Sequence, residues 1–183
     1  MTQFQEQGFE KWEKYIPSFF SNYLRNYFSL RTDNEQFVGD DQAPNSHAVY
    51  GDPAFDMLMF MSTPDIEEVV GKKLIPTYTY ARIYKNGSDL KIHSDRPECE
   101  YSVTLSLGGD SIWPISIKDY NGNNNSVDLK EGDMMVYHGT ELEHWRDKFE
   151  GQFQYQVFMH YVDADGEYKD RKYDGRRNIG LRK

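Results

Sequence analysis

The stretch from Tyr80 to Asp95, YARIYKNGSDLKIHSD, decides how the rest of the chain is interpreted. Its first part is rich in aromatic and β-branched residues, which predicts a strand over residues 77–84. Asn86-Gly87 then predicts a tight turn. Beyond the turn, one residue separates His93 from Asp95. Residues at this spacing share a face of a strand, so an imidazole and a carboxylate can reach the same point.

Downstream of this stretch, short β-rich segments follow one another closely and are separated by turns. Gly108-Gly109 and Glu131-Gly132-Asp133 are two of these turns, and the polar run Asp119–Ser126 is predicted to form a third at the surface. The strands predicted around these turns span residues 101–107, 112–117, 126–129, 134–137 and 153–162.

Upstream of Leu74 the periodicity favours helices. Apolar residues between Phe19 and Phe28 recur at spacings of three and four after Pro17-Ser18, which predicts a helix. A second helix is predicted to begin at Ser62-Thr63-Pro64 and to end at Gly71. Helices followed by closely spaced short strands predict an α+β protein whose core is an antiparallel barrel or jelly roll.

The length and composition indicate one domain without disulfides. A chain of 183 residues fits a single domain, and we interpret residues 1–73 as mainly helical support, 74–163 as the barrel and 164–183 as a basic tail. The single cysteine, Cys99, excludes an internal disulfide framework and a four-cysteine zinc site. No apolar run could span a membrane and the first residues do not form a signal peptide, so we expect an intracellular, cytoplasmic protein.

The charge of the chain is unevenly distributed. The formal net charge is −9, yet residues 169–183 carry seven Lys or Arg and two Asp, which leaves 14 basic and 28 acidic residues in 1–168. Such an acidic body is poorly suited to neutralise phosphates, so neither nucleic acid nor a membrane is an expected partner. The basic tail is expected either to be solvated or to dock onto the acidic body.

His93 and Asp95 become informative when a histidine from elsewhere joins them. Two imidazoles and one carboxylate form a facial triad that leaves three coordination positions open, a set diagnostic of non-haem Fe(II) oxygenases. Without a third ligand, a polar pair at a strand end on the surface is the simpler interpretation. Among the other histidines, His138 ends the predicted strand 134–137, and His144 lies beyond the turn that follows it.

The segment Tyr80–Asp95 resembles the 2-oxoglutarate/Fe(II) dioxygenases, specifically their prolyl 4-hydroxylase-like branch. In that family an Arg-Tyr-containing strand, a glycine turn and His-x-Asp follow in this order. Leu129–Tyr137 is similar to the Gly-Asp and apolar strand that precede the family's distal histidine, and His144 matches that histidine. The resemblance covers about residues 74–163. It implies a double-stranded β-helix (jelly-roll) barrel with N-terminal supporting helices, and Fe(II) bound by His93, Asp95 and His144, with His138 as the alternative third ligand.

The resemblance also implies 2-oxoglutarate as cosubstrate, with O2, and with ascorbate as an accessory reductant. The family binds the far carboxylate of 2-oxoglutarate with a tyrosine and a Lys or Arg, and Tyr84, nine residues before His93, matches the tyrosine. The cation that the family places on its last strand is missing from residues 151–156. Arg146, two residues after His144, is the expected replacement, and Arg82 is the second candidate.

Two alternatives remain open for these cosubstrate residues. Arg146 could instead form a surface ion pair with Glu143 or Glu150. Thr104 and Ser106, which alternate with Ser102 on one strand, are either further donors to the cosubstrate or part of a polar outer face.

The activity that the resemblance implies is hydroxylation of an unactivated C–H bond, with release of succinate and CO2. A prolyl residue in a peptide or protein is the expected substrate, and a free amino acid or small metabolite is the alternative. Two other classes stay open: a cupin-like metalloprotein that does not use 2-oxoglutarate, and a binding or structural jelly roll. The latter would not need three convergent metal ligands.

Overall fold

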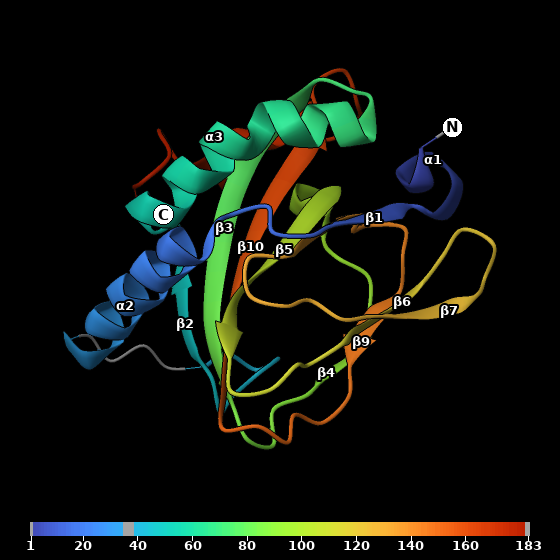
Figure 1. The fold of residues 1–183 in the computed structure, drawn as a ribbon. Coiled ribbons are helices and arrows are strands. Elements are labelled where there is room, and N and C mark those ends of the chain that lie inside the picture. Colours follow the sequence, from blue (N-terminus) through green and yellow to red (C-terminus); the bar gives the residue numbers. More distant parts are fainter. Residues whose placement is uncertain (1, 35–38, 182–183) are drawn as a thin grey trace.

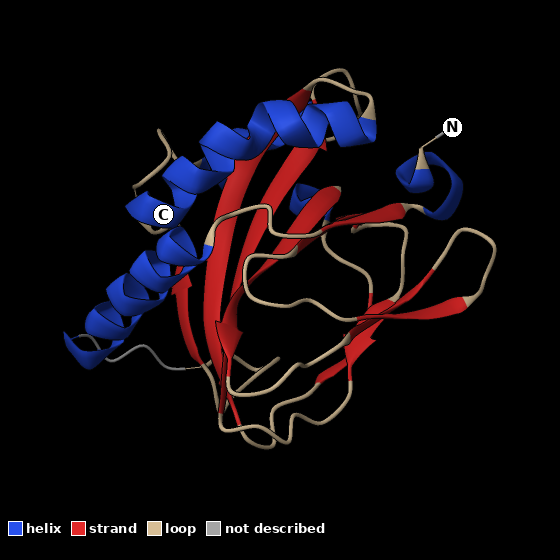
Figure 2. Cartoon of the chain, in the orientation of Figure 1, coloured by secondary structure: helices blue, strands red, loops and turns tan. Residues whose placement is uncertain are grey.

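Two antiparallel sheets form the centre of the computed structural model, which describes residues 2–34 and 39–181 (Figures 1 and 2). The larger sheet has the strand order β1-β8-β5-β10-β3-β2 and the smaller one β4-β9-β6-β7. In that order, the strands of the larger sheet are Phe9–Trp12, Met134–His138, Tyr101–Gly109, Phe153–Asp163, Leu74–Lys85 and His47–Tyr50, and those of the smaller sheet are Leu90–His93, His144–Arg146, Ile115–Lys118 and Asn124–Val127.

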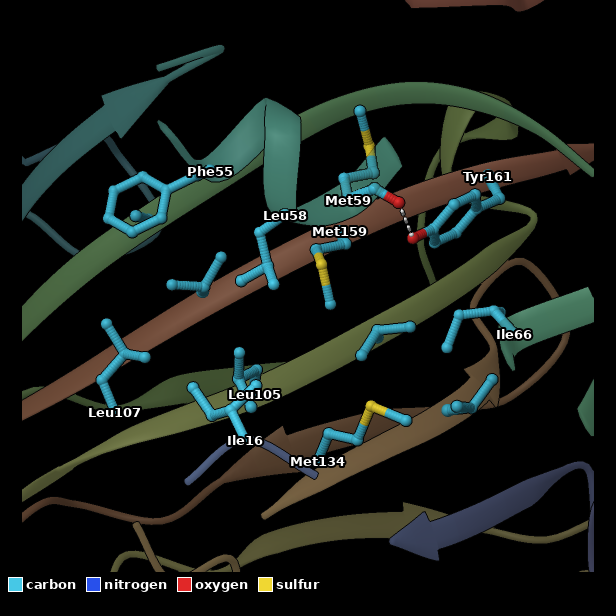
Figure 3. Packing of buried hydrophobic residues seen from close by; sticks show 14 of the residues in the cluster. Ile16, Phe55, Leu58, Met59, Ile66, Leu105, Leu107, Met134, Met159 and Tyr161 are labelled. Atoms are coloured by element: carbon cyan, nitrogen blue, oxygen red, sulfur yellow. Dashed lines mark hydrogen bonds between the residues drawn. The ribbon is translucent and has the colours of Figure 1, made fainter. Parts of the chain in front are cut away.

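Two long helices, α2 (Ser18–Asn34) and α3 (Pro53–Val70), cover one face of the larger sheet, and a short helix, α1 (Gln3–Gln7), lies near β1 (Figure 1). Figure 3 shows Leu58 and Met59 of α3 over Met159 of β10 and Leu105 of β5. The hydroxyl of Tyr161 also donates a hydrogen bond to the carbonyl of Met59 at 2.8 Å. This apolar layer therefore lies between the helices and the sheet, outside the space between the two sheets.

Strict alternation along β5 separates the apolar layer from the interior between the sheets. Val103, Leu105 and Leu107 pack toward the helices. The intervening side chains of Ser102, Thr104 and Ser106 are fully buried on the opposite face. The polar stripe is thus an inner face, not the outer face that was the alternative in the sequence, because a residue spacing of two places all three side chains between the sheets.

Helix α3 begins nine residues before the predicted start at Ser62. Asp52 caps it by accepting a hydrogen bond from the backbone N–H of Ala54, and Pro53 occupies its first turn. Pro64 therefore lies inside the helix, where its missing N–H is unfavourable. Burial of Phe55, Leu58, Met59 and Ile66 against the sheet offsets that cost. The predicted end is confirmed, since Gly71 caps the helix with a positive φ of 75°.

Several strand predictions are confirmed and others need correction. The strands around residues 77–84, 101–107, 134–137 and 153–162 are present. Strand β6 begins at Ile115 because Pro114 has no N–H to donate, and β7 lies two residues earlier than expected. The region 1–73 is not only helical, since β1 and β2 form the two edges of the larger sheet, where they pair with β8 and β3. Short edge strands of four residues carry too little periodicity to be recognised alone.

The basic tail docks onto the body of the protein. A 3₁₀ segment, η2 (Lys169–Gly175), lies against β3, and Arg176 inserts its guanidinium beside Asp56 of α3 with an N–O distance of 2.7 Å. Both side chains are fully buried. Among the described residues, no helix is both long enough and apolar enough to cross a membrane.

Candidate metal and cosubstrate site

His93, Asp95 and His144 converge on one point, with one potential ligand atom of each lying within 4.8 Å of the others. His93 and His144 face each other as a register pair of β4 and β9. Asp95 Oδ1 lies 3.8 Å from Nε2 of His93 and 3.6 Å from Nε2 of His144. Strand β4 ends at His93, so Asp95 comes from the segment after it, where its N–H donates to the carbonyl of Gly139 at 2.8 Å.

Backbone hydrogen bonds orient both imidazoles. Nδ1 of His93 lies 2.7 Å from the carbonyl of Lys91, and Nδ1 of His144 lies 2.9 Å from the carbonyl of Leu142. A carbonyl only accepts, so Nδ1 carries the proton in both rings and Nε2 keeps a lone pair. This is the arrangement usual for a histidine that binds a metal, and both lone pairs face the Asp95 carboxylate.

The surroundings of His93 and Asp95 favour a neutral imidazole and an ionised carboxylate. Burial, together with the nearby His144, lowers the pKa of His93 below its usual value. Burial alone would raise the pKa of Asp95. The polar neighbours of this carboxylate, His144 first among them and then His160 and Ser102, outweigh burial and keep that pKa below its usual value. At neutral pH His93 and Asp95 are therefore in the protonation states that metal binding requires.

A cavity of about 310 Å³ lies beside this donor set. It is lined by all three residues of the set and also by Tyr84, Arg82 and Arg146. Leu90, Ile115, Tyr137 and Phe158 supply apolar or aromatic parts of its wall. A volume near the lower end of the usual range for ligand sites fits a small molecule.

Arg146 is a buried cation with nitrogens that lack partners. Its side chain is 1% exposed, so it is not the surface residue of the alternative interpretation, and Glu143 pairs with Lys118 instead. Nη1 donates to the carbonyl of Trp113, but Nε and Nη2 have no hydrogen-bond partner among residues 2–34 and 39–181. Burial lowers the pKa of Arg146 to about 10, which leaves it charged at neutral pH. A buried charge without a counterion is costly, so this end of the cavity fits an anion.

Arg82 is already neutralised by its neighbours. It forms an ion pair with Asp40, and its Nη1 donates to Oε1 of Gln42 at 2.9 Å and to the hydroxyl of Tyr84 at 3.2 Å. Because the Tyr84 oxygen accepts this bond, its own proton is left for another acceptor. Of the two arginines, Arg146 is therefore the better receptor for a carboxylate.

Other predicted residues lie away from the cavity. Thr104 bonds to Gln156 at 3.1 Å and Ser106 to Gln154 at 3.0 Å, and neither serves as part of the cavity wall. His138, the alternative third ligand, lies 2.7 Å from the hydroxyl of Tyr120 and outside the donor set.

Sequence reasoning missed the contribution of the segment before β2. Nε2 of the Gln42 amide lies 3.1 Å from Nε2 of His93, and Asp40 and Gln42 both line the cavity. In this contact the Gln42 amide donates a hydrogen bond to the Nε2 lone pair of His93, which is the lone pair that would coordinate a metal. The Gln42 side chain must therefore move away when a metal binds. No local signal could have found it, because the contact joins residues 51 positions apart.

Solved structures share this fold at low sequence identity. A prolyl-4-hydroxylase from Pseudomonas putida aligns with a TM-score of 0.71 and 13% identity over 87% of this chain and 95% of its own. The non-haem, alpha-ketoglutarate-dependent epimerase SnoN aligns with a TM-score of 0.75 and 13% identity, over 98% and 88% of the two chains. HygX from Streptomyces hygroscopicus, solved with nickel and 2-oxoglutarate bound, gives 0.68 and 15%, over 90% and 88%.

No protein-family model matches the sequence, and neither does any curated protein. The likeness is therefore one of fold, extends over nearly the whole chain and agrees with the resemblance seen in the motifs. The chain has the jelly-roll fold of the 2-oxoglutarate-dependent non-haem iron oxygenases.

Proposed function

We propose that this protein is an Fe(II)- and 2-oxoglutarate-dependent oxygenase that hydroxylates an unactivated C–H bond. The observation that carries the proposal is that the His93–Asp95–His144 donor set and the unpartnered guanidinium of Arg146 line one cavity. The donor set suits Fe(II) and leaves positions open, and a guanidinium suits a carboxylate. 2-Oxoglutarate carries a chelating keto acid at one end and a second carboxylate at the other, so it matches both features.

Each residue of the cavity has a part in this proposal. His93, Asp95 and His144 would hold the iron, and Arg146 would bind the far carboxylate of the cosubstrate through Nε and Nη2. The Tyr84 hydroxyl would donate to the same carboxylate. When bound, Fe(II) and 2-oxoglutarate supply the oxidation, in which O2 is consumed and succinate and CO2 are released. The apolar part of the wall would limit the access of water to them.

For the substrate we propose a prolyl residue of a peptide or protein. The support is the motif resemblance, together with the likeness to a prolyl-4-hydroxylase. A small molecule is the second candidate, favoured by the likeness to HygX, which has been solved with hygromycin B bound. Succinate release in the presence of prolyl peptides, compared with free amino acids and aminoglycosides, would separate the two substrate classes.

The test of the cofactors is an anaerobic titration with Fe(II) and 2-oxoglutarate. We expect the weak visible charge-transfer band of the chelate in the wild type and its loss in His144→Ala. His138→Ala is the matched control and should keep the band, because His138 lies outside the donor set.

Iron binding without the band would contradict the use of 2-oxoglutarate and favour a cupin-like metalloprotein. Absence of iron binding, with equal stability of wild type and His93→Ala, would favour a binding or structural jelly roll.

A further inference from the structure

The two oxygens of the Asp95 carboxylate have different surroundings. Oδ1 faces Nε2 of both His93 and His144, at 3.8 and 3.6 Å. Oδ2 accepts a hydrogen bond from the hydroxyl of Ser102 on β5 at 2.8 Å. One oxygen is therefore directed to the donor set, and the other is directed to the larger sheet.

One direction fits the two shortest hydrogen bonds of the Ser102 hydroxyl. A serine hydroxyl carries one proton, and here Asp95 Oδ2, which can only accept, receives it. Nδ1 of His160 lies 2.9 Å from the same hydroxyl oxygen and must then be the donor of that second bond. The carbonyl of Cys99, at 3.2 Å, is a longer and competing acceptor. The bonds thus run from His160 to Ser102 and from Ser102 to Asp95.

This chain of bonds is built on the two central strands of the larger sheet. Ser102 of β5 and His160 of β10 are a register pair, and both are buried. On the other side, a Cβ at Gly139 would come within 2.5 Å of Asp95 Oδ2 and 2.7 Å of the Ser102 hydroxyl oxygen. The absence of that atom leaves just enough space for the carboxylate, which is therefore confined from two sides.

We propose that Ser102 and His160 are positioning residues that make Asp95 bind the metal through Oδ1 alone. The inference rests on the proposed function of the same site. A carboxylate with two free oxygens can bind an ion through both of them, which would fill a further coordination position. Occupying Oδ2 with a hydrogen bond keeps that position open for the cosubstrate and O2.

The same hydrogen bonds also favour one of two possible metal-binding groups that share Asp95. Asp95 also belongs to a second group whose ligand atoms lie within 4.8 Å of one another, formed with Cys99 and His160. Ser102 engages both Oδ2 of Asp95 and Nδ1 of His160. It therefore occupies two donor atoms on this side of the carboxylate and leaves Oδ1 to the histidine pair.

The test is a titration with Co²⁺ alone, followed by its visible d–d spectrum, which reports the number and kind of ligands. We expect Ser102→Ala to weaken Co²⁺ binding about 10- to 100-fold, the usual effect of losing a partner of a metal ligand. We also expect its spectrum to change, because Oδ2 becomes free to coordinate. Ser102→Thr, which keeps the hydroxyl, should restore both the affinity and the wild-type spectrum.

The matched control is Ser106→Ala, the same change four residues further along the same face of β5. Ser106 bonds to Gln154 and does not line the cavity, so Co²⁺ binding should be unchanged. If Ser102→Ala lowers the melting temperature too far for titration, His160→Leu provides the second variant. It leaves the Ser102 hydroxyl in place and removes the group that donates to it, so weaker Co²⁺ binding is again expected.

Equal affinity and an identical spectrum for wild type and Ser102→Ala would overturn this inference and leave the proposed function standing. In the substitute arm, wild-type binding by His160→Leu would overturn it in the same way. Failure of the wild type to bind Co²⁺ or Fe(II) would overturn the proposed function, and this inference with it.

Discussion

At the scale of single residues, the position of Arg146 lowers the stability of the folded, ligand-free protein. Its guanidinium is buried, and two of its nitrogens lack partners among the described residues. An arrangement of this kind destabilises the ligand-free protein and becomes favourable when an anion binds. Arg146 is therefore expected to lower the stability of the ligand-free protein and to strengthen the binding of an anionic ligand.

Replacement of Arg146 by Met tests that expectation. Met fills much of the same volume without a charge, so the ligand-free variant should be more stable than the wild type by about 1–3 kcal/mol. Loss of charge-assisted hydrogen bonds worth about 1.5–3 kcal/mol should weaken 2-oxoglutarate binding by roughly 10- to 150-fold. Chemical denaturation without ligand and isothermal titration with 2-oxoglutarate measure the two effects. A loss of stability with unchanged 2-oxoglutarate affinity would show that Arg146 has a purely structural role.

At the scale of elements, the turn before β8 depends on one carboxylate. Asp133 is buried and accepts hydrogen bonds from the backbone N–H groups of Lys14 at 2.9 Å and Lys130 at 3.0 Å. It also pairs with Lys11 of β1 at 3.1 Å. Burial acts to raise the pKa of Asp133, but these partners outweigh it and hold the pKa below its usual value. The carboxylate thus joins β1 to the turn that leads into β8.

This arrangement predicts a pH-dependent contribution to stability. Because the pKa of Asp133 is lower in the folded state, its contribution is present above the unfolded value of about 3.9 and is lost as the pH falls through the folded value. Asp133→Asn should therefore be less stable than the wild type at pH 7, by about 1.5–3 kcal/mol, and the difference should shrink toward pH 2. Urea unfolding across this pH range is the measurement, with the exposed Asp128→Asn as the control. A difference independent of pH would contradict the explanation.

At the scale of the whole molecule, the tail is held by a buried ion pair. Arg176 donates to Asp56 and to the carbonyl of Thr77, and the Asp56 carboxylate also accepts from the hydroxyl of Thr79.

Arg176→Met would leave the Asp56 charge buried without its cation, a change that costs about 3–5 kcal/mol. Arg177→Met, at the exposed neighbouring position, should change stability by less than about 0.5 kcal/mol. Urea denaturation compares them, and equal effects would mean that the tail adds no stability through Arg176.

How much of this molecule the sequence could predict depends on the separation of the interacting residues. The strand 77–84 and the spacing of His93 and Asp95 are local, and they led to the correct fold. The inner position of Ser102 could not be distinguished from an outer one, because alternation gives two faces without saying which is buried. Gln42 beside His93, and the ion pair that Asp40 forms with Arg82, depend on contacts between distant segments. Local patterns carry no information about such contacts.

The strand order of the larger sheet has a consequence for the synthesis of the protein. Strand β10, the last strand of the chain described here, lies in the middle of the sheet, between β5 and β3 (Figure 1). On the ribosome, β3 and β5 are made first, and each presents an open strand edge until residue 163 has emerged. Open edges of this kind readily pair with other chains. The nascent protein therefore passes through a period of exposure to aggregation, and translation speed through residues 110–163 sets how long it lasts.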